Sequence, residues 1–346
     1  MNSVTQFLYN ILAGINGVVG NYGVSIIIFT FLMRMICMPF DYKSRKGMRK
    51  MSAIQPKLNE LQKKYGNDKQ KFQQKQAELM RKEGYNPLSG CLPMLLTWPL
   101  MIAMFAAMRA IANEQLAMQA FRYLAGEDNV VSAADRFLWV KNIWMTDSLF
   151  TPIAPNASAL QVITQDVWQR AYDLLNDAQR SAIIQNLAGQ ALDFSSSAAV
   201  KASVEAMTNA LQSIPTYAAA VEPVSGWSGL NFFLFTVTLY KQYNGLLIFP
   251  ILAGVTQILQ TKYNPQMTEQ ATAQPSNGQG AGMNNFMKYF FPLLSVFFCL
   301  TSNAGFAVYW VTSTCVMWLQ SIVITKYLAK KDEQKAKSVT GEGSVK

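Results

Sequence analysis

Arg34 is the side chain with the clearest capacity for chemistry, because it lies inside the otherwise apolar run from Tyr22 to Phe40. At about 1.5 Å per residue a helix of this length covers roughly 28 Å, close to the hydrocarbon thickness of a bilayer. A cation at that depth costs on the order of 2.5–3.5 kcal/mol. Such an arginine either reaches the nearby interface, pairs with a buried acid, or faces a wet cavity inside a helical bundle.

Polar residues in other apolar segments favour the wet cavity. Thr30 shares a helix face with Arg34 because it lies four residues earlier. The sequence has five long apolar segments, at 22–40, 91–111, 245–262, 286–303 and 304–325. None of them contains an Asp or Glu that could pair with Arg34. A Ser/Thr/Gln stripe alone is more often interhelical contact, but beside an unpaired Arg it favours a hydrophilic groove. The candidate groove residues are Thr30, Arg34, Gln257, Gln260, Tyr309, Trp310, Ser313 and Gln320.

Several classes of chemistry find no support in the composition. Histidine is absent, and the four cysteines form no CxxC pair, so no metal site is indicated. No nucleophile motif or phosphate loop is present, so we predict neither an enzyme nor a bound cofactor. The net charge of +10 would suggest nucleic acid in a soluble protein, but its uneven distribution favours a membrane topology signal over sequence-specific nucleic-acid binding.

Hydrophobic residues gather in long blocks, and only 14% of the 346 residues are charged. A soluble domain carries roughly 25%. The sequence therefore predicts an all-α polytopic membrane protein with five transmembrane helices around a hydrophilic groove. The predicted spans are 22–40, 91–111, 245–262, 286–303 and 304–325.

Charge asymmetry predicts which segments lie on each side of the membrane. Residues 41–85 carry thirteen Lys and Arg against five Asp and Glu, whereas residues 109–244 carry eight against eleven. The positive-inside rule therefore places the N-terminus outside and the C-terminus in the cytoplasm. The remaining segments are an interfacial helix at 1–21, a basic cytoplasmic hairpin at 41–90, an extracytoplasmic region at 112–244, a flexible cytoplasmic loop at 263–285 and a basic cytoplasmic tail at 326–346.

Two of these segments have predicted internal structure. In the hairpin, Gly66 supplies a helix stop and Asp68 a candidate N-cap. The hairpin is either a solvated topology signal or a docking surface for anionic lipid, the ribosome or a targeting partner. In the extracytoplasmic region, residues 166–190 and 198–212 have amphipathic spacing. They predict a helical insertion at about 150–226, which could also be only a spacer.

Five sequence stretches together resemble the YidC/Oxa/Alb membrane protein insertase family, in its bacterial five-span form. They are FTFLMRMICMP in the first span, the hairpin from MRKMSAIQPKL to LTWPL, FLWVKNI at 137–143, FPILAGVTQILQTK at 249–262, and MKYFFPLLSVFF with AGFAVYWVTSTCVMWLQSIV at 287–323. The resemblance covers roughly residues 20–145 and 228–328. Thr97 departs from the family's frequent Gln, and the segment from about 150 to 226 has no counterpart in the core pattern.

The resemblance implies a positively charged groove that opens to the cytoplasm and the lipid. Arg34 would be the groove arginine with Thr30 beside it, and Tyr309 and Trp310 would contact a passing substrate helix. Residues 137–143 would be a short external helix. The implied partners are nascent membrane proteins and the bilayer of the bacterial plasma membrane, with the ribosome, signal recognition particle or its receptor, or the Sec translocon at the hairpin and tail.

Two other functions compete with an insertase. A transporter or channel could bind an anion through Arg34, although such folds usually contain internal repeats and none is visible here. A non-catalytic assembly factor would differ in needing partners for any insertion activity.

Overall fold

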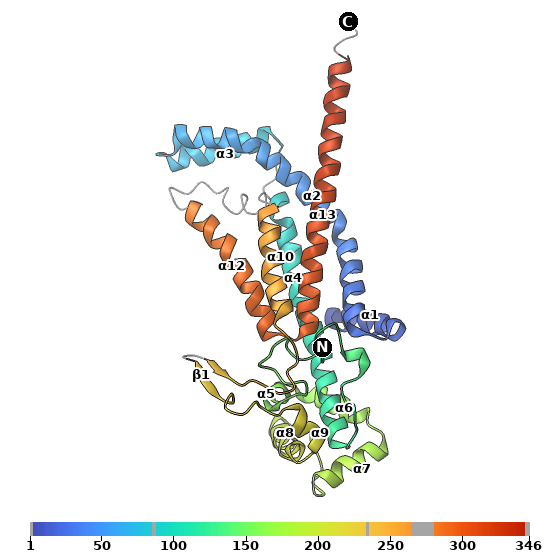
Figure 1. Cartoon of the computed structure of the whole chain (residues 1–346). Coiled ribbons are helices and arrows are strands. Elements are labelled where there is room, and N and C mark those ends of the chain that lie inside the picture. The colour runs from blue at the N-terminus through green and yellow to red at the C-terminus, as the bar shows by residue number, and fades with distance from the viewer. Residues whose placement is uncertain (1–2, 85–87, 233–234, 264–279, 343–346) are drawn as a thin grey trace. The chain divides into compact units, whose positions relative to one another are not determined.

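The computed structural model describes residues 3–84, 88–232, 235–263 and 280–342, and the described part is predominantly helical (Figure 1). This confirms the predicted helical class. The helices are α1 (Ser3–Val19), α2 (Tyr22–Tyr65), α3 (Lys69–Lys82), α4 (Leu88–Leu124), the 3-10 turn η1 (Ala133–Asp135), α5 (Ala157–Gln161), α6 (Gln165–Asp173), α7 (Asp177–Asn186), α8 (Ser197–Gln212), α9 (Pro215–Ala220), α10 (Ile248–Tyr263), α12 (Gly280–Thr301) and α13 (Ala304–Glu342). One small antiparallel pair, β1 (Leu230–Phe232) and β2 (Phe235–Val237), adds to the expected helices.

The chain forms two compact units, and several helices contribute residues to both. Unit 1 comprises residues 1–29, 102–252 and 296–310, and unit 2 comprises residues 30–101, 253–295 and 311–346. The candidate groove residues Arg34, Ser313 and Gln320 belong to unit 2, and the insertion at about 150–226 belongs to unit 1.

Two described helices are long and apolar enough to cross a membrane, within Tyr22–Tyr65 and Ala304–Gln334. A shorter apolar helix runs over Tyr289–Thr301. Less than half of the most apolar stretch of each long helix is buried inside the protein. Large apolar side chains are instead exposed, among them Ile36 on α2 and Val323 on α13. Because water does not favour such surfaces, these faces fit contact with lipid tails.

Helix α2 does not end at Pro39, where the apolar run ends. It continues through Pro39 and Pro56 to Tyr65. The basic stretch after Phe40 is rich in Lys, Arg, Met and Gln, which are strong helix formers, and this outweighs one missing backbone hydrogen bond at each proline. Likewise α13 continues through the predicted tail to Glu342. A change of polarity therefore does not mark a helix end in this chain.

The basic hairpin forms as predicted. The Asp68 side chain accepts a hydrogen bond from the Lys71 backbone N–H at 3.0 Å and caps α3. Ile54 and Leu58 are buried on α2 and pack with Leu79 and Met80 of α3. Unit 2 therefore contains a helical hairpin with an apolar seam of its own.

The insertion packs onto the C-terminal part of α4 in unit 1. Phe121 of α4 lies edge-on to Trp168 of α6, with ring centroids 5.4 Å apart, and Trp168 stacks on Phe194 at 5.8 Å. Trp168 is fully buried. These rings bury large apolar areas and prefer such edge and stacked geometries. The insertion is thus part of the core of unit 1, which argues against a loose spacer.

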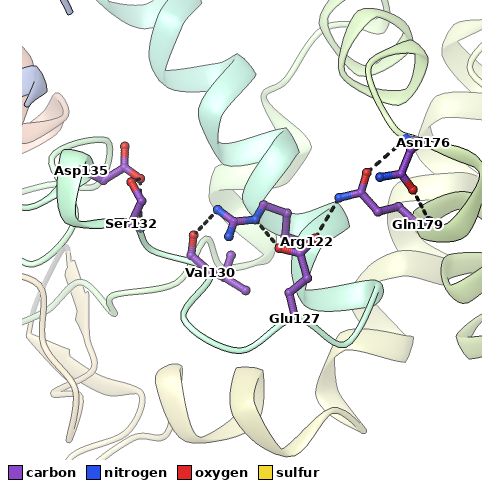
Figure 2. A network of polar contacts seen from close by, with 7 residues as sticks. All are labelled: Arg122, Glu127, Val130, Ser132, Asp135, Asn176 and Gln179. Atoms are coloured by element: carbon purple, nitrogen blue, oxygen red, sulfur yellow. Dashed lines mark hydrogen bonds and ion pairs between the residues drawn. The ribbon is translucent and has the colours of Figure 1, made fainter. Parts of the chain in front are cut away.

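A polar network also fastens the insertion to the end of α4 (Figure 2). Arg122 Nε donates to Glu127 at 2.6 Å, and another guanidinium nitrogen donates to the Val130 carbonyl at 2.8 Å. Gln179 of α7 donates to the other Glu127 oxygen at 2.8 Å and completes a capping box with Asn176. This cap begins α7, so residues 166–190, expected as one amphipathic stretch, contain two helices.

Residues 137–143 do not form the expected short helix. Phe137 and Val140 instead form an antiparallel bridge around a turn in which Leu138 has φ 53°. The Asn244 side-chain oxygen accepts a hydrogen bond from the Asn142 backbone N–H at 2.7 Å, and the Asn244 side-chain nitrogen donates to the Asn142 carbonyl at 2.9 Å. A partner 102 residues away therefore determines the local backbone, and the local pattern could not reveal it.

Candidate groove site

Arg34 is buried against α13 in unit 2. Its side chain is 6% exposed, and its Nε donates to the Ser313 hydroxyl at 2.8 Å. A second guanidinium nitrogen donates to the same oxygen. Gln320 Nε2 donates to the Arg34 backbone carbonyl at 3.0 Å. The structure therefore brings three predicted groove residues together, on two helices that lie side by side (Figure 1).

The hydrogen bonding of this cluster is incomplete. A guanidinium carries five N–H donors. Within the described residues, those of Arg34 reach a single neutral acceptor, Ser313, and form no ion pair. Gln320 Oε1 is buried and has no partner among the same residues. Buried polar groups without partners cost stability, so this cluster is suited to receiving a further polar group or water.

Sequence reasoning missed a continuation of this polar face along α2. Asp41 lies seven residues after Arg34, and Arg45 lies four residues after Asp41, which places all three on one face of the continuous helix. Arg45 is buried, and the charges of Arg34 and Arg45 both act on the Asp41 carboxyl group. No contact-distance ion pair joins Arg34 and Asp41 in the described part of the chain.

The five apolar segments contain no acid, as expected, and Asp41 lies one residue after the predicted span 22–40. The spacing of Thr30, Arg34, Asp41 and Arg45 was the available signal. It is visible only when the helix is continued past Pro39, as it is in the structure.

The other predicted polar residues of the groove lie on α2 and α10. Thr30 is fully buried on α2, Gln260 is buried on α10, and Gln257 is half-buried. No hydrogen bond joins Arg34 to Gln257 or Gln260 among the residues described. Their membership in one groove with Arg34 remains a prediction.

Tyr309 and Trp310 belong to unit 1, where they form an aromatic cluster with neighbours on α12 and α13. Trp310 lies 5.6 Å from Phe306 and 6.2 Å from Phe298, between ring centroids. Tyr309 is buried beside Phe306, whereas Trp310 is partly exposed. The indole of Trp310 is therefore the more accessible of the two rings.

Unit 1 contains a contrasting buried charge, Asp147, with complete hydrogen bonding. One carboxylate oxygen accepts from the N–H groups of Leu246 and Leu247 at 2.8 and 3.2 Å. The other accepts from Phe249 N–H at 2.8 Å and Trp139 Nε1 at 3.2 Å. The side chain is fully buried. It fixes the start of α10, the helix whose later residues include Gln257 and Gln260.

A family model described as 60Kd inner membrane protein matches residues 14–199 and 206–332. The chain belongs to this family, the YidC/Oxa/Alb family. The match extends into residues 150–199 and 206–226, a segment expected to have no counterpart in the family's core pattern. Whether this segment belongs to the family's core pattern stays a prediction.

Curated relatives of this chain are named membrane protein insertase YidC. The protein from Fusobacterium nucleatum is 36% identical over 140 residues, which is 40% of this chain and 60% of the relative. The protein from Pelodictyon phaeoclathratiforme is 36% identical over 140 residues, or 40% of this chain and 21% of the relative. The protein from Aromatoleum aromaticum is 45% identical over 98 residues, or 28% and 18%. The chain thus spans less than two thirds of the length of each of these relatives.

Proposed function

We propose that this protein is a membrane insertase that inserts nascent membrane proteins and helps them fold, without covalent chemistry. The observation that carries the proposal is the incomplete coordination of Arg34, a buried cation with one neutral hydrogen-bond partner in the described structure. Family membership supports the same function, since relatives carry the name membrane protein insertase. The comparisons give no support to an anion transporter.

The proposed topology has five spans around one groove, with the N-terminus outside and the C-terminus in the cytoplasm of a bacterial inner membrane. Charge asymmetry supports the orientation. Exposed apolar side chains on the four helices α2, α10, α12 and α13 support lipid contact along them. They include Ile36, Ile258, Leu293 and Val323.

In the proposed mechanism the groove receives the polar tail of a substrate. The Arg34 donors that find no partner in the described structure form charge-assisted hydrogen bonds with an acidic side chain, which are stronger than neutral ones. A low local dielectric strengthens this attraction. The substrate's hydrophobic segment then passes the Trp310 side of α13 into lipid, driven by burial of apolar surface. Thr30, Gln257, Gln260, Tyr309, Ser313 and Gln320 complete the proposed groove.

The basic hairpin and the C-terminal part of α13 are the proposed contacts for cytoplasmic partners. The ribosome, signal recognition particle or its receptor, and the Sec translocon are the candidates. The support is the excess of cations over residues 41–85, which favours anionic surfaces.

Reconstituted insertion tests the role of Arg34. The assay measures protease protection of a single-span substrate with an acidic translocated tail, in vesicles of phosphatidylethanolamine and phosphatidylglycerol. For Arg34→Ala we expect protease protection of the substrate to fall roughly tenfold. A tenfold change is equivalent to about 1.4 kcal/mol, which is comparable to one hydrogen bond to a charged group. Arg34→Lys keeps the charge and should fall less.

Two controls isolate the charge effect. Lys43→Ala removes an exposed cation from the same helix and should leave insertion unchanged. A substrate whose acidic tail residues are replaced by Gln should lose most of its sensitivity to Arg34→Ala. Equal insertion of the acidic-tail substrate by wild type and Arg34→Ala would exclude the proposed role of Arg34.

A further inference from the structure

A cavity of about 440 Å³ lies within unit 1, apart from the Arg34 cluster. Its walls come from α4, from the loop between Trp144 and Thr151, from α5 of the insertion, and from the junction of α12 and α13 between Thr301 and Phe306. This volume is in the range of small-molecule sites. The insertion contributes Asn156, Ser158, Ala159 and Val162 to the lining, so it completes a wall of the cavity.

Among the described lining residues, Arg109 of α4 is the one ionisable side chain. No ion pair or hydrogen bond joins the Arg109 side chain to another residue in the part of the chain that the structure describes. No Asp or Glu is among the described lining residues. The cavity therefore favours an anion by its charge.

Neutral polar groups of α4 and of other elements also line the cavity. Asn113 comes from α4, Thr146 from the loop, Asn156 from the insertion, and Asn303 from the junction before α13. Amide and hydroxyl groups can donate to anion oxygens without adding charge. Donors on several sides suit a group with several acceptor oxygens, and a guanidinium matches phosphate oxygens with two parallel N–H donors.

One wall is apolar. Phe105 and Phe306 meet edge to face at 5.1 Å between centroids, and Met108 and Val162 also line the cavity. An inorganic anion alone would leave this wall without a partner. A phosphate ester with an apolar portion fits both the cation and the apolar wall.

We propose that this cavity binds the phosphate ester of an amphiphile, with Arg109 on the phosphate and the Phe105 wall on the apolar portion. The shared chemistry is a phosphate ester, which a phospholipid headgroup or a soluble metabolite could supply. Arg109 lies near the end of the predicted span 91–111, at the depth of lipid headgroups in the proposed topology. The site goes beyond the proposed insertase function, which does not require it.

Titration calorimetry of the purified full-length protein in dodecyl maltoside tests this site. The probes are dihexanoyl phosphatidylglycerol below its critical micelle concentration and sn-glycerol 3-phosphate. We expect saturable binding of one phosphatidylglycerol per chain, roughly tenfold weaker in Arg109→Gln. Ala159→Phe, which fills the cavity without touching the charge, should also weaken binding. Arg136→Gln, an exposed arginine outside the lining, is the matched control and should bind as wild type does.

The two probes distinguish a lipid headgroup from a soluble metabolite as the source of the phosphate ester. Binding of phosphatidylglycerol that is much tighter than binding of glycerol 3-phosphate supports a lipid headgroup. Equal binding of both would exclude a contact between the Phe105 wall and an apolar portion, and so would overturn the proposal. Absence of saturable binding, or binding that is equal in wild type, Arg109→Gln and Ala159→Phe, overturns the proposal. Since the measurement does not involve insertion, its failure is distinct from failure of the insertase function. Unchanged thermal unfolding of both variants confirms that they are folded.

Discussion

Two buried charges, one in each unit, differ in how they are satisfied. Asp147 in unit 1 accepts four hydrogen bonds, three of them from backbone N–H groups near the start of α10. Arg34 in unit 2 donates to one hydroxyl, that of Ser313, although its guanidinium has capacity for more. Both side chains are removed from solvent.

The difference separates a charge that holds structure from a charge that is available for binding. A fully coordinated carboxylate at a helix start offsets its desolvation cost and fixes the backbone around it. Glycine at 245 is part of this fit, because a Cβ there would lie 2.0 Å from Asp147 Oδ1. A partly coordinated guanidinium leaves its desolvation cost unbalanced, and a ligand can supply the missing partners.

The largest expected effect is on stability, from Asp147→Ala. The change removes the acceptor of three backbone N–H groups and of the Trp139 indole, so we expect a loss of roughly 3–5 kcal/mol, as for other broken buried charge networks. Thermal unfolding in detergent measures it. Asp193→Ala removes an exposed acid of the same unit as a control. A shift no larger than that of the control would mean that Asp147 does not organise this region.

The second prediction concerns Ser313→Ala. It removes the acceptor that the Arg34 guanidinium has among the described residues. We expect a cost of about 1 kcal/mol because Arg34 already has further donors that polar surroundings can satisfy. Insertion of acidic-tail substrates should persist. Ser295→Ala is the matched control, since that buried hydroxyl bonds only within its own helix, to the Phe291 carbonyl. If Ser313→Ala destabilises the protein as much as Asp147→Ala does, Arg34 is a structural charge and the comparison fails.

The sequence was most informative where the determinants are local. The Asp68 cap follows from the local sequence of the hairpin, and it forms as predicted. Arg34 and Ser313 were both singled out, but their contact joins residues 279 apart and depends on how α2 and α13 pack. Asp41 lies directly after the polarity change at residue 40, so a span that ends there excludes it. The local pattern at 137–143 does not reveal its backbone conformation, because Asn244, which bonds the Asn142 backbone, lies 102 residues away.

The third prediction uses the half-exposed network around Glu127. Burial raises the pKa of this carboxyl group, but hydrogen bonds from Arg122 and Gln179 and the Arg122 charge outweigh burial and hold its pKa below the ordinary value. Its stabilising contribution is therefore present above the unfolded pKa, near 4.5, and is lost as pH falls through the lower folded pKa. Solvent screening limits it to about 0.2–1 kcal/mol.

Glu127→Gln tests this dependence. Thermal unfolding in detergent should give a lower midpoint than wild type at pH 7, and the difference should shrink as the pH falls below about 4. Asp128→Asn, which neutralises the neighbouring acid, is the control. A difference between wild type and Glu127→Gln that stays constant across this pH range would mean that charge does not contribute to the way α4 holds the insertion.

The smallest expected effect is in the hairpin of unit 2, where Lys57 and Glu83 form an exposed ion pair at 2.6 Å. Such pairs are screened by water and salt, so we expect Lys57→Ala to leave the thermal midpoint unchanged at 0.15 M salt. The neighbouring Leu58→Ala deletes a buried side chain of the seam and should open the hairpin, seen as faster amide hydrogen exchange in α3. Faster exchange in Lys57→Ala as well would mean that charge holds the hairpin. Its surface cations would then be structural, in the way that Asp147 is in unit 1, and less available to a cytoplasmic partner.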